Sequence, residues 1–244
     1  MQKYFISDSD FENKRITSDD AFHIKNVMRS KIGDEFLIGN NQKCYLAKIT
    51  KLNNKDVEFE IEKEMIGNTE LPVFVTLFQG YPKVDKMADI IKHSTELGVF
   101  EIVPTIMKRS LFKLDSNKKD NKLARFNKIA KEAAEQSYRM IVPNVSDIIN
   151  LKKIDFSLFD KKILCFEEDA KEGKLTGLSS VVRNLKSGDK VAIVIGPEGG
   201  IDMEEYDYLT NQGFVSCALG KRILRTETAS FYALSAISYE LEVR

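Results

Sequence analysis

The stretch VAIVIGPEGGI, residues 191–201, decides the fold of the C-terminal part of the chain. Its first five residues are apolar, which is typical of a strand buried on both faces of a parallel sheet. They run directly into the turn Gly196-Pro197-Glu198-Gly199-Gly200, and Asp202 with Glu205 then has the spacing of a capping box that begins a helix. In sheets that alternate with helices, ligands bind beyond the carboxyl ends of the strands. We therefore expect the glycine-rich turn to lie at the ligand-binding edge of a sheet.

The same alternation of strand and helix continues over residues 72–244. Apolar runs at 73–78, 99–103, 162–166 and 214–219 predict four further strands. Apolar residues at helical spacing predict helices near 84–95, 123–137, 175–185 and 228–243. This pattern predicts an α/β domain with a mainly parallel sheet and helices on both faces.

Residues 1–71 have a different period. In DVEFEIE, residues 56–62, Val57, Phe59 and Ile61 alternate with acidic residues, which indicates a half-buried strand. The segment KCYLAKIT, residues 43–50, alternates in the same way, and a single helix is expected after Thr17 or Ser18. The pattern predicts a small antiparallel barrel that forms a separate domain.

The composition excludes several classes of protein. None of the apolar runs approaches the ~18 residues that a membrane helix needs, so we expect no membrane partner. Three widely spaced cysteines favour free thiols in a reducing cytoplasm, and two isolated histidines argue against a metal site. The formal net charge is zero, so nucleic-acid binding would need a local basic patch.

One such patch is present at residues 108–131. It contains nine Lys or Arg against two Asp, a local charge of +7. A charge run of this kind is typical of an RNA contact, and equally of a solvated loop and helix face.

A second loop, LGKRILRTETA at 219–229, is expected at the same edge of the sheet as the glycine turn. Ile223 and Leu224 are apolar within this loop, and they either contact a ligand ring or plug the end of the sheet. The glycine turn lacks both the Gly-x-Gly-x-x-Gly spacing and a following Gly-Lys-Ser/Thr, so a dinucleotide or phosphate loop is poorly supported. A flat neutral group suits this bare backbone, although an ordinary strand-to-helix connection also explains it.

Four motifs, in this order and spacing, resemble a known family. They are STELGV (94–99), AAEQSYR (133–139), IGPEGG (195–200) and LGKRILRTETA (219–229). They are similar to those of the SPOUT-class RNA methyltransferases of the RsmE type, which methylate N3 of a uridine in 16S ribosomal RNA. The resemblance covers nearly the whole chain, with FHIKNVMRSKIGDEF (22–36) similar to the first domain of that family.

The resemblance implies a PUA-like RNA-binding barrel at 1–71 and a methyltransferase domain with a C-terminal trefoil knot at 72–244. It also implies a homodimer and an S-adenosylmethionine pocket made by three loops. The residues that it assigns to the pocket are Leu77, Gly80, Ile195, Gly196, Pro197, Glu198, Gly199, Gly200, Leu219, Gly220, Ile223, Leu224, Arg225, Thr226, Glu227, Thr228 and Ala229.

Arg225 is the candidate catalytic residue, because a cation near the base favours the deprotonated uracil or grips the neighbouring phosphate. A salt bridge from Arg225 to Glu227 or Glu198 is the alternative. The candidate RNA contacts are His23, Arg29, Lys31, Lys83, Arg109 and Arg139, and a packed helix histidine is the alternative for His23. Where the family has an arginine, Lys3 would make a single-point phosphate contact.

Two other functions remain open from the sequence. One is a non-catalytic RNA-binding module on a knotted scaffold, and the other is a SPOUT methyltransferase that acts on transfer RNA or on a ribose. The intact glycine and RTETA loops argue against the first, and the N-terminal barrel argues against the second.

Overall fold

The computed structural model describes residues 1–111, 119–173 and 177–244, which form two compact units. The first unit comprises Met1–Glu70 and Ala134–Val142, and the second comprises Leu71–Ala133 and Pro143–Arg244. The predicted division falls between residues 71 and 72, but it does not anticipate that residues 134–142 belong to the first unit. No helix in the described ranges is both long and apolar enough to cross a membrane.

The first unit is built on a five-stranded sheet in the order β1-β3-β4-β5-β2. Its strands are β1 (Lys3–Phe5), β2 (Arg15–Ile16), β3 (Glu35–Asn40), β4 (Lys43–Leu52) and β5 (Val57–Met65). The pairs are antiparallel except β1 with β3. Ala47, Ile49, Val57 and Phe59 are buried in one core, which confirms the period-two pattern.

Three short helical segments accompany this sheet: α1 (Asp8–Glu12), α2 (Ser18–Phe22) and the π-helical turn η1 (His23–Val27). The Ser7 side chain caps α1, a helix that the sequence pattern does not predict. Thr17 occupies the N-cap position of α2 as expected, but its side chain makes no capping hydrogen bond.

The second unit contains a seven-stranded sheet in the order β12-β10-β11-β6-β7-β8, with β9 also pairing with β7. Its strands are β6 (Phe74–Gly80), β7 (Glu101–Ile106), β8 (Asn144–Val145), β9 (Ile149–Asn150), β10 (Lys161–Cys165), β11 (Lys190–Ile195) and β12 (Val215–Cys217). All the described pairs are parallel, which confirms the predicted sheet. The prediction for β7 was wrong by two residues at its start, and β12 is only three residues long.

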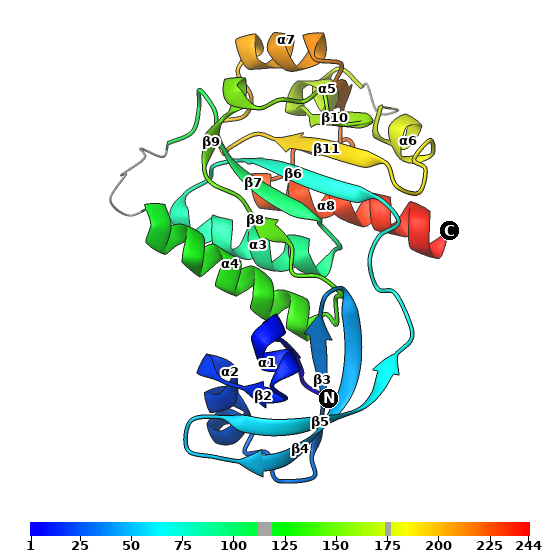
Figure 1. The fold of residues 1–244 in the computed structure, drawn as a ribbon. Coiled ribbons are helices and arrows are strands. Elements are labelled where there is room, and N and C mark those ends of the chain that lie inside the picture. The colour runs from blue at the N-terminus through cyan, green and yellow to red at the C-terminus, as the bar shows by residue number, and fades with distance from the viewer. Residues whose placement is uncertain (112–118, 174–176) are drawn as a thin grey trace. The chain divides into compact units, whose positions relative to one another are not determined.

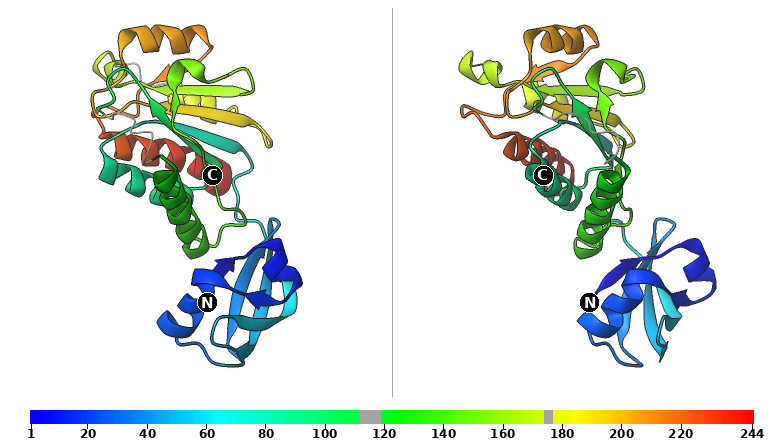
Figure 2. Two further views of the ribbon diagram at one scale, coloured as in Figure 1. Left: turned by 60° about the vertical axis from the view of Figure 1, so that its left-hand side comes forward. Right: turned by 90° about the vertical axis from the view of Figure 1, so that its left-hand side faces the viewer.

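Helices cover both faces of this sheet (Figure 1). They are α3 (Val84–Glu96), α4 (Lys119–Gln136), the short α5 (Glu167–Lys171) and α6 (Gly177–Val182), α7 (Met203–Asn211) and α8 (Thr226–Ser238), with the turns η3 (Leu151–Lys153) and η4 (Tyr239–Val243). Helices α3 and α8 pack against each other on one face, as the two further views in Figure 2 also show. Helix α7 lies on the opposite face and begins with the predicted capping box of Asp202 and Glu205.

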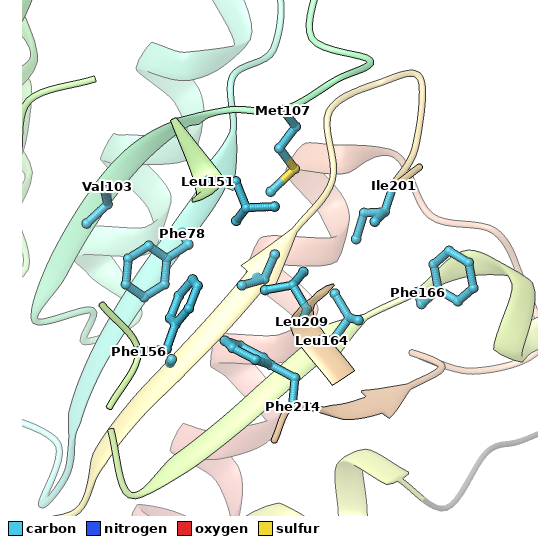
Figure 3. Close-up of a cluster of buried hydrophobic side chains, with 12 residues drawn as sticks. Phe78, Val103, Met107, Leu151, Phe156, Leu164, Phe166, Ile201, Leu209 and Phe214 are labelled. Carbon is cyan, nitrogen blue, oxygen red and sulfur yellow. The ribbon is translucent and has the colours of Figure 1, made fainter. Parts of the chain in front are cut away.

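Aromatic and aliphatic side chains from the strands and from α7 form a buried cluster (Figure 3). Phe78 of β6 and Leu209 of α7 belong to this cluster. The rings of Phe156 and Phe214 pack edge to face, with 4.9 Å between their centroids. Because side chains alternate along a strand, Gln79 next to Phe78 points to the other face, toward α8. A buried polar side chain is thus placed beside the start of the last helix.

Candidate functional site

A cavity of about 200 Å³ lies at the carboxyl ends of β10, β11 and β12. It is lined by Cys165, Phe166, Glu167, Ala170, Ile195, Gly196, Pro197, Glu198, Gly199, Gly200, Cys217, Leu219, Arg222, Ile223, Leu224, Thr226 and Ala229. The glycine turn contributes five of these residues, three of them glycines without a side chain, and the loop before α8 contributes four. The cavity thus lies at the ligand-binding edge predicted for a parallel sheet.

The Thr226 hydroxyl joins the segments that form this cavity. It donates to the carbonyl oxygen of Gly196 at 2.6 Å and accepts from the Gln79 amide at 2.8 Å. Ser230, one turn further along α8, donates to the Gln79 carbonyl oxygen at 2.5 Å. All three side chains are buried, so these bonds are shielded from water and hold the ends of β6 and β11 against α8.

Two glycines allow the close approach of these loops. A Cβ on Gly80 would lie 2.5 Å from the Pro197 nitrogen and 2.7 Å from the Gly196 carbonyl carbon, so only glycine fits there. Gly200 has a φ of +73°, and a side chain on it would collide with the Glu167 carboxylate. The bare backbone of the turn therefore serves contacts within the protein as well as access to the cavity.

Lys86 of α3 contacts one carboxylate in the glycine turn and one in the first turn of α8. Its ammonium lies 3.6 Å from Glu198 Oε1 and 3.2 Å from Glu227 Oε2. The salt bridge considered for Arg225 was therefore wrong, because Lys86 occupies both carboxylates. Arg225 is exposed at the N-cap of α8, and it has no ion pair among the described residues.

The loop after β7 is held against the start of α7. Lys108 Nζ lies 3.0 Å from Asp202 Oδ1, and Arg109 contacts the other Asp202 oxygen at 3.4 Å and the Gly199 carbonyl at 3.3 Å. The hydrogen bond from Lys108 lowers the pKa of the Asp202 carboxyl. Arg109 thus lies beside the glycine turn with part of its guanidinium exposed.

Eleven of the residues expected in the cofactor pocket line the cavity, and six do not. Leu77 is fully buried in β6, and Gly80 packs against the main chain of Gly196 and Pro197. Gly220 lines a different cavity, formed with α6 and α8. The other residues outside the lining are Arg225, Glu227 and Thr228.

The sequence pattern missed six lining residues: Cys165, Phe166, Glu167, Ala170, Cys217 and Arg222. Cys165 and Cys217 are paired in register on adjacent strands, and burial raises the pKa of both thiols, that of Cys217 to about 12. The segment 166–170 has no role in the sequence-based prediction, yet Phe166 and Glu167 form one wall. Segment 166–170 follows a predicted strand, and this position at the carboxyl end of the sheet could have identified it as part of the pocket.

The predicted RNA contacts fall in both units. His23, Arg29 and Lys31 lie in the first unit, where Arg29 and Lys31 are exposed and His23 shares a 2.9 Å hydrogen bond with the Tyr4 hydroxyl. Lys83 and Arg109 lie in the second unit, and both are exposed. Residues 112–118 of the basic run, which include Lys113 and Lys118, lie outside the described residues.

Arg139 and Lys3 have surroundings that differ from those of an RNA contact. The Arg139 side chain is only 3% exposed and forms an ion pair with Glu70. Lys3 is 1% exposed and donates to the Arg139 carbonyl, so the expected phosphate contact of Lys3 was wrong. Burial lowers the pKa of the Lys3 ammonium. Both cations instead hold segment 134–142 within the first unit.

The two parts of the chain match two families that act on RNA. Residues 69–238 match the RNA methyltransferase domain, and residues 16–62 match the RNA methyltransferase PUA domain. A crystal structure of ribosomal RNA small subunit methyltransferase E from Neisseria gonorrhoeae, bound to S-adenosyl methionine, is 29% identical with a TM-score of 0.78 and covers 98% of this chain and 97% of that one. The fold and the family matches thus define a SPOUT-type methyltransferase domain with a PUA-like barrel.

The relatives define the family more narrowly. Ribosomal RNA small subunit methyltransferase E of Bacillus subtilis (strain 168) is 42% identical over 254 residues, covering 100% of this chain and 98% of that protein. Its namesake in Buchnera aphidicola subsp. Acyrthosiphon pisum (strain APS) is 31% identical, covering 97% and 87%. The chain belongs to the ribosomal RNA small subunit methyltransferase E family.

Proposed function

We propose that the protein transfers a methyl group from S-adenosylmethionine to N3 of a uridine in 16S ribosomal RNA. The observation that carries this proposal is the cavity at the ends of β10, β11 and β12, where the glycine turn and the loop 219–226 meet. The relative from Neisseria gonorrhoeae binds S-adenosyl methionine, and the names of the relatives specify small-subunit ribosomal RNA. The cofactor supplies an electrophilic methyl group, while the chain binds and orients both substrates.

The uracil N3 must lose its proton before or during the transfer, and the base must leave its stack to reach the pocket. The candidate group is Arg225, which is exposed beside the cavity and free of the carboxylates of Glu198 and Glu227. A guanidinium there stabilises the uracil anion by charge. Because Lys86 rather than Arg225 contacts these two carboxylates, the Arg225 guanidinium is not held in an ion pair with them.

The RNA surface that we propose has two parts. Arg29 and Lys31, with His23 beside them, form the part in the first unit, and Lys83 with Arg109 forms the part next to the glycine turn in the second. Their positive charge attracts phosphates without sequence preference. Buried Arg139 pairs with Glu70 and is not part of this surface in our proposal.

We also propose a homodimer and a cytoplasmic location. Tyr232 and Tyr239 near the C-terminus are exposed apolar side chains, which fit burial against a second copy. All three cysteines, Cys44, Cys165 and Cys217, are free, as expected in a reducing compartment where ribosomal subunits assemble. No group of three or more His, Cys, Asp or Glu in the described ranges is placed to hold a metal ion.

The test is methyl transfer to small ribosomal subunits that lack the modification. A methyl group at N3 blocks Watson–Crick pairing, so the product is mapped as a stop in reverse transcription. Arg225→Ala should reduce turnover at saturating cofactor by about tenfold or more. The matched control replaces Arg244, another exposed arginine, and Arg244→Ala should leave turnover unchanged. Tight RNA binding with no methylated uridine would favour the non-catalytic module, and a modified nucleotide in transfer RNA would favour the other methyltransferase.

A further inference from the structure

Among the residues that the structure describes, three charged side chains line the cavity: Glu167, Glu198 and Arg222. Glu198 already has partners within the protein, since it shares the Lys86 ammonium with Glu227 and accepts from the Lys83 backbone N–H at 3.1 Å. Glu167 and Arg222 have neither an ion pair nor a side-chain hydrogen bond within the described ranges. The cavity therefore offers one anion and one cation whose charges the protein itself does not satisfy.

Glu167 is held at the cavity by its place in the chain. It follows the end of β10 and begins α5, and its carboxylate lies against Gly200 of the glycine turn. Glu167 is half-buried, so the lower dielectric there makes its attraction to a cationic partner stronger than in open solvent.

Arg222 lies in the loop that follows β12 and lines the same cavity as Glu167. Strands β10 and β12 are paired with Cys165 opposite Cys217, and the Phe166 N–H donates to the Cys217 carbonyl at 3.1 Å. The chain continues from the end of β10 to Glu167 and from the end of β12 through a loop to Arg222, and both side chains line the cavity at these strand ends. A ligand that carries a positive and a negative group close together fits this arrangement.

The proposed cofactor has such a group in its methionyl amino acid, with an α-ammonium and an α-carboxylate. It also carries a sulfonium, but the charge on sulfur disappears as the methyl group leaves. A carboxylate held against the sulfonium would stabilise the ground state more than the transition state and would slow the reaction. The ammonium keeps its charge throughout, so a carboxylate bound there costs nothing in rate.

We propose that Glu167 binds the α-ammonium and Arg222 binds the α-carboxylate of the cofactor's amino-acid group. This assignment rests on the proposed function, because it concerns the same cavity. The two side chains then select adenosyl compounds that carry an intact amino acid over those that lack it.

Calorimetric titration of the full chain with three compounds tests the assignment. S-adenosylhomocysteine carries both charged groups of the amino acid and no sulfonium, decarboxylated S-adenosylmethionine keeps the ammonium and the sulfonium but lacks the carboxylate, and methylthioadenosine has none of the three. The variants are Glu167→Gln and Arg222→Met. Their matched controls are the chain neighbours Glu168→Gln and Lys221→Met, which lie outside the cavity lining. Thermal unfolding of each variant verifies that it is folded.

Glu167→Gln should weaken binding of the first two compounds about tenfold, the loss expected for a hydrogen bond to a charged group, and leave methylthioadenosine within twofold. Arg222→Met should weaken S-adenosylhomocysteine alone, and neither control should change any affinity. Equal losses for all three compounds, or no loss for any, would overturn the assignment while leaving the cofactor site in place. A wild-type chain that binds none of the three would refute both the assignment and the proposed function.

Discussion

Replacing Thr226 with valine removes one hydroxyl and almost no volume. The hydroxyl is buried and bridges the Gly196 carbonyl and the Gln79 amide, at 2.6 and 2.8 Å. Without it, both partners keep their burial and lose a bond. Gln79 retains its hydrogen bond to the Gly80 carbonyl at 3.0 Å, so the larger loss falls on Gly196.

An unsatisfied buried polar group costs about 1–3 kcal/mol, and one of the two groups is partly satisfied, so we expect Thr226→Val to lower the free energy of unfolding by about 2–4 kcal/mol. The same change should weaken cofactor binding, because Thr226 and Gly196 both line the cavity. Urea unfolding followed by circular dichroism measures the first effect, and calorimetry with S-adenosylhomocysteine measures the second.

Thr210→Val is the matched control. The Thr210 hydroxyl donates only to the Tyr206 and Asp207 carbonyls of its own helix, at 3.0 and 3.1 Å. Its loss should cost less than about 0.5 kcal/mol, as for most surface substitutions, and should leave the cofactor affinity unchanged. If Thr226→Val and Thr210→Val gave the same unfolding midpoint and the same affinity, the bridging role of Thr226 would be refuted.

Three further predictions follow from other contacts. Gly80→Ala forces the turn at Pro197 away, and it should lower both the stability, by about 1–3 kcal/mol, and the cofactor affinity. Gly213→Ala, at a φ of +86° with no atom within 4 Å of the added Cβ, should lower the stability alone. An equal loss of affinity in both variants would contradict this. The raised pKa of Cys217, about 12, predicts alkylation at pH 8 far slower in the native chain than in urea, and a native rate equal to that of the unfolded chain would show that the thiol is accessible. The hydrogen bond from Lys108 lowers the pKa of Asp202, so the ionised carboxylate stabilises the folded state. This stabilisation is fully present above the unfolded-state pKa of about 3.9 and is lost as the pH falls through the lower pKa of the folded state. The urea midpoints of wild type and Asp202→Asn should therefore differ at pH 6 and converge below pH 4, and a gap independent of pH would exclude this ion pair as its cause.

The parts of the fold that follow from local pattern were predictable. Residues 191–195 are apolar without interruption, and Asp202 with Glu205 forms the expected capping box at the start of α7. Both features depend on residues that are close in sequence, where period and spacing are informative. The expectation of a knotted path came from the family resemblance alone and stays a prediction, since the spacing of apolar residues carries no information about threading.

The partners of charged residues were less predictable, because they depend on contacts between distant segments. Lys86 pairs with carboxylates more than 100 positions away, and Arg139 pairs with Glu70. Glu167 reaches the cavity because β10 lies between β11 and β12, an order that strand propensity does not reveal. Helical or alternating patterns identify which side chains are buried, but they do not identify which charges meet.

A crystal structure of the chain grown with S-adenosylhomocysteine would show where the adenosyl group binds. The account predicts its density between the Gly196–Gly200 turn and the loop that contains Leu219 and Leu224, with the Thr226–Gly196 hydrogen bond retained. Density for the compound elsewhere in the chain, with this cavity empty, would contradict it.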